Sequence, residues 1–176
     1  LDDNKYVPND ISLSVDNDGI LLFGLNAAGK SSLAKSIGCA VIMAQAGMFV
    51  ACSSMTFNPY KYLFTRIRNN DDIYAGLSSF EVEMREFKVI LDYSNSESLI
   101  LGDELCSGTE TLDATALMAS GLQQLCKRNA SFIFATHLHF LTELECVNNL
   151  DNLVYKHIAV NRDPQNPSRL IYERKL

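Results

Sequence analysis

Short apolar runs alternate along this chain with segments whose apolar residues recur at helical spacing. The runs, each short enough for a strand that is buried on both faces, are Gly19–Phe23, Ser98–Leu101 and Ser131–Thr136. The segments that predict helices are Lys30–Ala46, Ser79–Tyr93 and Leu112–Lys127. Strands that alternate with helices favour an α/β fold, in which helices cover both faces of a mainly parallel sheet.

Two other regions lack this alternation. The stretch Ser53–Leu77 is rich in turn signals and predicts irregular structure. Towards the end of the chain, Leu153–Val160 and Arg169–Arg174 predict the two strands of an antiparallel hairpin, connected through the turn residues Pro164–Ser168. We therefore expect a hairpin appended to the parallel sheet.

A glycine-rich segment connects the first strand to the first helix. Its sequence GLNAAGKS, Gly24–Ser31, fits the pattern G-x-x-x-x-G-K-[ST] that wraps nucleotide phosphates. Gly24 and Gly29 let the backbone curl so that N–H groups face phosphate oxygens, and the following helix adds the positive end of its dipole. Lys30 would reach the β- and γ-phosphates, and the Ser31 hydroxyl would ligate Mg²⁺. The segment predicts a site for a nucleoside triphosphate rather than a glycine-rich turn without a ligand.

An acidic pair follows the second apolar run. Asp103 and Glu104 come directly after Gly102, at the end of that strand. In a phosphate-loop protein, a carboxylate at the end of a neighbouring parallel strand holds Mg²⁺, and the next carboxylate can polarise the attacking water. Successive side chains at a strand end diverge, so the two acids can take these two roles. Alone the pair would be an ordinary exit from a strand, but together with the phosphate loop it predicts nucleotide hydrolysis.

The composition fits one compact domain over residues 1–176. Hydrophobic residues make up 47% of the chain, enough for a substantial core. The longest apolar run, Cys39–Cys52, is interrupted by Gln45 and is shorter than the roughly 20 residues of a membrane span, so we expect no membrane association. Five scattered cysteines without a C-x-x-C favour reduced thiols in an intracellular compartment, without distinguishing cytoplasm, nucleus, organelle or virus-associated site. Because the first residue is Leu1 rather than Met, we expect a piece of a larger protein.

Several motifs follow one another in a specific order. They are YVPND, GLNAAGKSS, MAQAGMFV, LFTRIRNNDD, LSSFEVEM, LILGDEL, SGTETLD and FATH. This ordered set, from Tyr6 to about Leu144 and more faintly to Leu176, resembles the ATPase domain of the MutS family of DNA mismatch-recognition proteins. The resemblance implies a P-loop NTPase fold of the ABC type that hydrolyses ATP with Mg²⁺.

At some positions the chain differs from the usual family pattern, which around the loop is G-P-N-M-G-G-K-S-T. The differing positions are Leu25, Ala27, Ala28 and Ser32 in the loop, and Gly102, Cys106, Ser107 and Ala114 in the later motifs. None of these differences removes a ligand of phosphate, Mg²⁺ or water. They indicate a divergent lineage, such as the one associated with large viruses and organelles.

The resemblance also implies a role for individual residues. Glu104 corresponds to the general base, and His137 to a switch histidine on the γ-phosphate side of the site, with Lys30 as the catalytic lysine. The implied nucleotide-binding positions are Tyr6, Gly24, Asn26, Ala27, Ala28, Gly29, Lys30, Ser31, Ser32 and Ser78. The implied metal ligands are Ser31 and Asp103.

Three of these residues also have a local explanation. Tyr6, which would stack on adenine, could be an ordinary tyrosine of an edge strand. Asn26, which would sense the γ-phosphate, could serve a tight turn that requires unusual dihedral angles. His137 could be a hydrogen-bonded cap at the end of its strand, and a metal pair with His139 lacks further Cys or His ligands at suitable spacing.

The resemblance also implies that Ser78 makes a contact between subunits. In the family, the corresponding serine opens a helix whose N-terminus points across a dimer interface at the γ-phosphate of the partner, where unpaired N–H groups favour an anion. Locally, Ser78 and Glu81 would form an S-x-x-E capping box for their own helix. Likewise, the segment Ser107–Asp113 would cross to the partner's site or form a polar loop with Asp113 in the first turn of the next helix.

We therefore expect ATP binding and hydrolysis that drive the conformational cycle of a MutS-like protein, at two composite sites of a homo- or heterodimer. A net charge of −6 gives little basic surface, so duplex DNA would be bound by domains absent from this chain. One alternative is another ABC-type ATPase, of the transporter or chromosome-maintenance type, which would have L-S-G-G-Q where this chain has LSSFEVEM. A second alternative is a nucleotide-binding module without hydrolysis, which Lys30, Asp103 and Glu104 argue against.

Overall fold

A five-stranded parallel sheet lies at the centre of the computed structural model, which describes residues 6–14, 16–67, 79–106, 108–164 and 170–176. The strands follow the order β2-β3-β4-β1-β5, and each neighbouring pair is parallel. Their bounds are Gly19–Phe23 (β1), Tyr62–Arg66 (β2), Ser98–Asp103 (β3), Ser131–Ala135 (β4) and Leu153–His157 (β5). The predicted α/β class with a mainly parallel sheet is confirmed.

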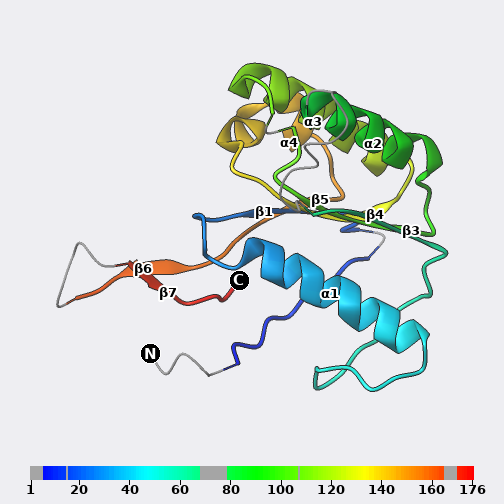
Figure 1. Ribbon diagram of the computed structural model, residues 1–176, viewed down its shortest axis with the longest axis vertical. Coiled ribbons are helices and arrows are strands. Elements are labelled where there is room, and N and C mark those ends of the chain that lie inside the picture. Colours follow the sequence, from blue (N-terminus) through cyan, green and yellow to red (C-terminus); the bar gives the residue numbers. More distant parts are fainter. Residues whose placement is uncertain (1–5, 15, 68–78, 107, 165–169) are drawn as a thin grey trace.

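Helices cover both faces of this sheet. One face is covered by α1 (Lys30–Gln45), whereas α2 (Ser79–Tyr93), α3 (Thr111–Lys127) and α4 (Glu145–Asn148) lie on the other (Figure 1). A short 3-10 helix, η1 (His139–Glu143), precedes α4. The three long helices agree with the predicted bounds to within one residue. In the ranges given above, no helix is long and apolar enough to cross a bilayer.

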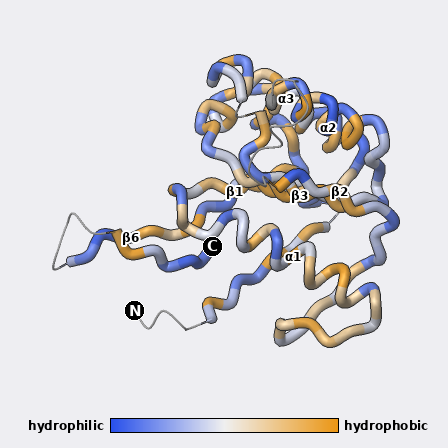
Figure 2. The backbone as a smooth tube through the Cα atoms, viewed as in Figure 1, coloured by the Kyte–Doolittle hydropathy of each residue, from blue (hydrophilic) through white to orange (hydrophobic). Residues whose placement is uncertain are grey.

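The strands place alternate side chains in two separate cores. In β3, Ile100 packs into the core formed with α2 and α3, whereas Leu99 and Leu101 pack into the core beside α1. Figure 2 shows hydrophobic residues concentrated along the strands between the two helix layers. A strand that is covered on both faces must be apolar at successive positions, so β1, β3 and β4 appear in the sequence as continuous apolar runs.

One strand lies in the stretch that was predicted to be irregular. β2 pairs with β3 at the edge of the sheet, with Tyr62 opposite Ser98. Tyr62 and Thr65 are exposed, and Tyr62 is 46% accessible to solvent. A half-exposed edge strand lacks a continuous apolar run, and its partner is distant in sequence. The prediction of irregular structure over Ser53–Leu77 is therefore wrong for residues 62–66.

The predicted C-terminal hairpin is present, but its first strand is shorter and begins later. Residues 153–157 form β5, which joins the main sheet parallel to β1, with Leu153 opposite Gly19. The hairpin consists of β6 (Val160–Arg162) and β7 (Leu170–Tyr172), which are antiparallel. The alternating pattern over Leu153–Val160 thus contains two strands with different partners, and the prediction of one hairpin arm there is wrong.

This hairpin packs against the segment between β1 and α1. The side chain of Ala28 is fully buried in a small apolar cluster with Leu22 and Ile158, which Val160, Tyr172 and Leu176 help to cover. Asn9 fixes the end of the chain, because its Nδ2 donates to the carbonyl of Arg174 at 2.9 Å and its Oδ1 accepts from the Leu176 N–H at 2.8 Å. Residues from both ends of the chain therefore support the glycine-rich loop.

Candidate functional site

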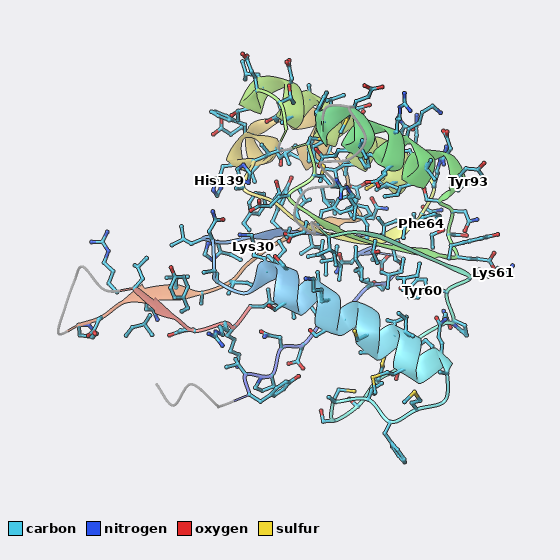
Figure 3. All side chains as sticks on the ribbon, in the orientation of Figure 1. Lys30, Tyr60, Lys61, Phe64, Tyr93 and His139 are labelled. Carbon is cyan, nitrogen blue, oxygen red and sulfur yellow. The ribbon has the colours of Figure 1, made fainter. Side chains whose placement is uncertain are left out.

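The loop between β1 and α1 has the backbone that its glycines predicted. Positive φ angles occur at Gly24 (153°), Ala27 (66°) and Gly29 (108°), so the chain curls before α1 begins at Lys30. The Lys30 side chain is 5% exposed, and its Nζ donates to the carbonyl oxygens of Gly24 at 2.7 Å and Leu25 at 3.3 Å. Figure 3 shows Lys30 at the start of α1, beside the sheet. The ammonium group is therefore held inside the loop, where phosphate oxygens would meet it.

The left-handed turn position belongs to Ala27 and not to Asn26. Asn26 lies in the turn and is exposed, but its φ is not positive. Asn26 thus lies in the tight turn that its local explanation requires, but the left-handed residue of that turn is Ala27.

The acidic pair lies at the end of β3, as predicted. Asp103 is the last residue of β3 and is 9% exposed, and its Oδ1 is buried without a hydrogen-bond partner. Glu104 follows with a φ of 51°, and its N–H donates to the carbonyl of Ala135 at 2.8 Å. Because Glu104 leaves the strand in this left-handed conformation, the two carboxylates have different surroundings. One is buried and unpaired, whereas the other is partly exposed at the rim.

The strand that bears the acidic pair is not a neighbour of β1. β4 lies between β1 and β3, and Ala135 of β4 is opposite both Leu22 of β1 and Asp103 of β3. The prediction that the acidic pair follows a strand next to β1 is therefore wrong, because β4 lies between β1 and β3. The intervening strand contributes to the site itself, because the C-terminal ends of parallel strands meet at one edge of the sheet.

β4 delivers His137 to the same edge. The Nδ1 atom of His137 lies 3.9 Å from Oε1 of Glu104, and the His137 side chain is 52% exposed. The local cap at this strand end is made by Thr136, which is 1% exposed and whose Oγ1 accepts from the Leu138 N–H at 3.1 Å. Thr136, and not His137, therefore makes the hydrogen bond that caps this strand end. The histidine is directed towards the acidic pair.

Gly102 permits the close packing of β3 and β4 beside the acids. A Cβ atom added at Gly102 would lie 2.5 Å from Cδ1 of Phe134, whose side chain is fully buried. A larger residue would require Phe134 to move within a close-packed core. This packing explains why glycine precedes Asp103 in this chain.

The donor set suits Mg²⁺ with a triphosphate. Mg²⁺ prefers hard oxygen ligands and usually keeps several waters, binding through one or two carboxylates together with substrate phosphates. Ser31 is the second residue of α1 and would offer a hydroxyl, and Asp103 would offer its unpaired carboxylate oxygen Oδ1. In the part of the chain that the structure describes, no group of three or more His, Cys, Asp or Glu residues could form an all-protein metal site. The residues present therefore fit a magnesium nucleotide.

Tyr6 and the loop line the same large groove. The groove, of about 1740 Å³, extends along α1 and is lined by Ala27, Ala28 and Gly29 as well as by Tyr6, whose hydroxyl donates to the carbonyl of Ala51 at 3.5 Å. It is larger than the 300–1000 Å³ usual for a small-molecule site, so a nucleotide would fill only part of it. Tyr6 is 73% exposed and lies in no strand. Its interpretation as an edge-strand tyrosine is therefore wrong, and its exposed ring is available for stacking.

Two predicted contacts involve residues whose surroundings the structure leaves undescribed. Ser78 and Ser107 lie outside the described ranges, so neither the capping box nor the contact with a partner subunit is tested. Asp113 lies in the first turn of α3, which confirms that the SGTETLD segment leads into a helix. A Cβ atom added at Gly108 would lie 3.2 Å from Cβ of Phe80, so this segment passes close to the first turn of α2.

One buried residue near the site was missed in the sequence. Glu83 of α2 is 3% exposed, and its Oε1 accepts from the N–H of Cys106 at 3.0 Å. A signal was present, because Glu83 lies three residues after Phe80 and four before Phe87 and therefore shares the apolar face of the helix. A carboxylate on such a face is buried and requires a partner.

Comparison with known proteins gives one consistent result. A model of MutS domain V matches residues 20–176. The mitochondrial DNA mismatch repair protein mutS homolog of Sarcophyton glaucum is 47% identical over 166 residues, which cover 94% of this chain and 16% of that relative. A putative DNA mismatch repair protein mutS homolog of Acanthamoeba polyphaga mimivirus is 37% identical over 210 residues, which cover 99% of this chain and 19% of that relative. The DNA mismatch repair protein MutS of Staphylococcus carnosus is 38% identical over 166 residues, which cover 92% of this chain and 18% of that relative. The chain thus spans 16% to 19% of the length of these relatives.

Proposed function

This chain belongs to the MutS family, as its domain V, and from that premise we propose that it binds and hydrolyses ATP with Mg²⁺ to drive the conformational cycle of a DNA mismatch-repair protein. The observation that supports this most directly is the convergence at one sheet edge. The start of α1 contributes the buried ammonium of Lys30, and the end of β3 contributes the unpaired carboxylate oxygen of Asp103 and the partly exposed carboxylate of Glu104. These groups provide a phosphate clamp, a metal ligand and a base.

Each group has a defined task in in-line attack of water on the γ-phosphate. Lys30 exchanges its bonds to the loop carbonyls for bonds to phosphate oxygens, and thereby orients the triphosphate. Ser31 and Asp103 would hold Mg²⁺, which when bound neutralises negative charge on the phosphates. Glu104 accepts the proton of the attacking water, because a carboxylate at the rim can reach a water that the buried Asp103 cannot. His137 contacts the γ-phosphate side of the site from the neighbouring strand.

Dimerisation is part of the proposal. The family resemblance implies that Ser78 and the segment 107–113 face the γ-phosphate of a partner subunit. The close approach of Gly108 to Phe80 supports this, because it brings the second segment beside the helix that Ser78 precedes. We therefore infer that turnover requires a homo- or heterodimer with two composite sites.

DNA contact is assigned to the rest of the protein. Net charge is −6, whereas binding to a duplex requires neutralisation of several phosphates by Lys and Arg. We infer that the duplex is bound by parts of the protein beyond this chain. Submicromolar binding of duplex DNA by the isolated chain at physiological salt, measured by fluorescence anisotropy, would overturn this assignment.

A phosphate-release assay on the assembled full-length protein tests the proposal. Turnover that depends on both ATP and Mg²⁺, and that Lys30→Ala abolishes, is the expected result. A protein that binds ATP tightly but releases no phosphate would instead be a nucleotide-binding module without hydrolysis. Another type of ABC ATPase is disfavoured by the family match and by LSSFEVEM at the position of its signature motif.

A further inference from the structure

A buried carboxylate connects α2 to the turn that follows the proposed base. Glu83 is 3% exposed, and its Oε1 accepts from the N–H of Cys106, a residue 23 positions further along the chain, at 3.0 Å. Cys106 is itself fully buried. The bond therefore forms inside the protein, where a charged acceptor makes a strong hydrogen bond and an unpaired N–H is costly.

The turn that this bond holds is conformationally unfavourable. Glu104 has a φ of 51° and Cys106 a φ of 63°, and neither residue is glycine. Left-handed conformations of such residues persist only where the surrounding structure fixes them. Two hydrogen bonds do so here, one from Glu104 N–H to the Ala135 carbonyl at 2.8 Å and the other from Cys106 N–H to Glu83. β4 and α2 thus hold the turn from opposite ends.

A second contact joins the same elements. The backbone at Gly108 approaches Phe80 so closely that an added Cβ would lie 3.2 Å from the Phe80 Cβ. Burial, reinforced by the charge of Glu83, raises the pKa of the Cys106 thiol to about 12, so that the thiol stays neutral beside the carboxylate. The first two turns of α2 therefore pack against the backbone at Cys106 and Gly108.

We propose that Glu83 is a positioning residue that sets the orientation of Glu104 through the Glu104–Cys106 turn and thereby links the position of α2 to hydrolysis. The inference rests on the proposed ATPase function, because it assigns to Glu83 an effect on the base of that reaction. Glu83 does not touch the nucleotide in this scheme. Its removal should therefore lower kcat and leave the KM for ATP nearly unchanged.

The test uses the assembled full-length protein with Glu83→Ala, Glu83→Gln and a control, Asp92→Ala. The glutamine oxygen can accept the same hydrogen bond, whereas Asp92 is an exposed residue of α2 whose carboxylate forms a surface ion pair with Lys88. We expect Glu83→Ala to lower kcat between about tenfold and a hundredfold, because small displacements of a catalytic group have effects of this size. Glu83→Gln should restore most of the lost turnover, and Asp92→Ala should match the parent.

A double-mutant cycle separates positioning from general damage to the fold. In a Glu104→Gln background the base is already absent, so Glu83→Ala should cause no further loss if it acts through Glu104. An equal fold-loss in both backgrounds, or parent kcat in Glu83→Ala, would overturn the inference. Should Glu83→Ala fail to fold, Glu83→Asp, which is one methylene shorter, is tested and judged by the same criteria. A parent protein without turnover would refute the proposed function itself, whereas failure of the Glu83 variants alone leaves that function intact.

Discussion

The Oε1 atom of Glu104 lies 3.9 Å from the Nδ1 atom of His137, although the two residues come from different strands. The distance is too long for a direct hydrogen bond, although it is short enough for an ion pair. Both are partly exposed at the edge where β3 and β4 end. Because Glu104 is partly exposed at this edge whereas Asp103 is buried, the geometry favours Glu104 over Asp103 as the proposed base.

Replacement of Glu104 by Gln should separate binding from chemistry. The amide keeps the shape of the side chain but cannot accept a proton from water. We expect ATP binding to remain and hydrolysis to slow by a factor on the order of 10² or more. Single-turnover phosphate release and a nucleotide titration on the same assembled sample measure both quantities. Hydrolysis at the parent rate would show that the base has been assigned wrongly.

Replacement of Asp103 by Asn should have opposite effects on activity and stability. The variant loses a charged oxygen that would bind Mg²⁺, so the Mg²⁺ concentration for half-maximal turnover should rise by at least about tenfold. The same change replaces a buried carboxylate, whose Oδ1 has no partner, by a neutral amide that costs less to bury, so the free energy of unfolding should stay unchanged or rise by about 1 kcal/mol. A Mg²⁺ titration and a thermal melt test the two effects. An unchanged Mg²⁺ requirement would exclude Asp103 as the metal ligand.

The two buried cysteines should resist alkylation until the domain unfolds. Burial raises the pKa of Cys106 to about 12 and that of Cys126 to about 11, so neither forms a thiolate near neutral pH. These folded-state pKa values exceed the ordinary thiol value of 9.0. The free energy of unfolding should therefore be constant below about pH 9 and should fall as the pH rises towards 11 and 12, because the two thiols lose their protons at a lower pH in the unfolded chain than in the folded one. Alkylation followed by mass spectrometry and urea midpoints at pH 8 and pH 10 provide the check. Rapid modification of Cys106 in the folded protein would contradict its burial.

Replacement of Ser78 by Ala distinguishes two roles for this serine. A contact across the dimer predicts lower turnover per folded dimer, and mixing with a Lys30→Ala subunit should leave hydrolysis at only one type of composite site. A purely local cap predicts a loss of about 1 kcal/mol in stability with turnover intact. Thermal stability and dimer turnover measured on one sample decide between them. A lowered melting temperature with unchanged turnover would reject the contact across the dimer.

The sequence alone was sufficient for features that depend on neighbouring residues. The pattern Gly24–Ser31 places a curled loop before a helix, and the structure contains both. The apolar residues of α2 recur at helical spacing, so its bounds Ser79–Tyr93 were predicted correctly. The continuous apolar runs likewise located β1, β3 and β4, because strands buried on both faces must be apolar at every position.

The tertiary structure decided which segments lie next to one another. Periodicity reports whether a residue is buried, but not which strand it pairs with. The sequence therefore could not place β4 between β1 and β3, separate β5 from the hairpin, or reveal the edge strand β2. The hydrogen bond from Cys106 to Glu83 likewise depends on two elements that meet only in the folded chain. Local chemistry was encoded in short motifs, whereas the site was assembled by hydrogen bonds and packing between distant residues, which only the fold could specify.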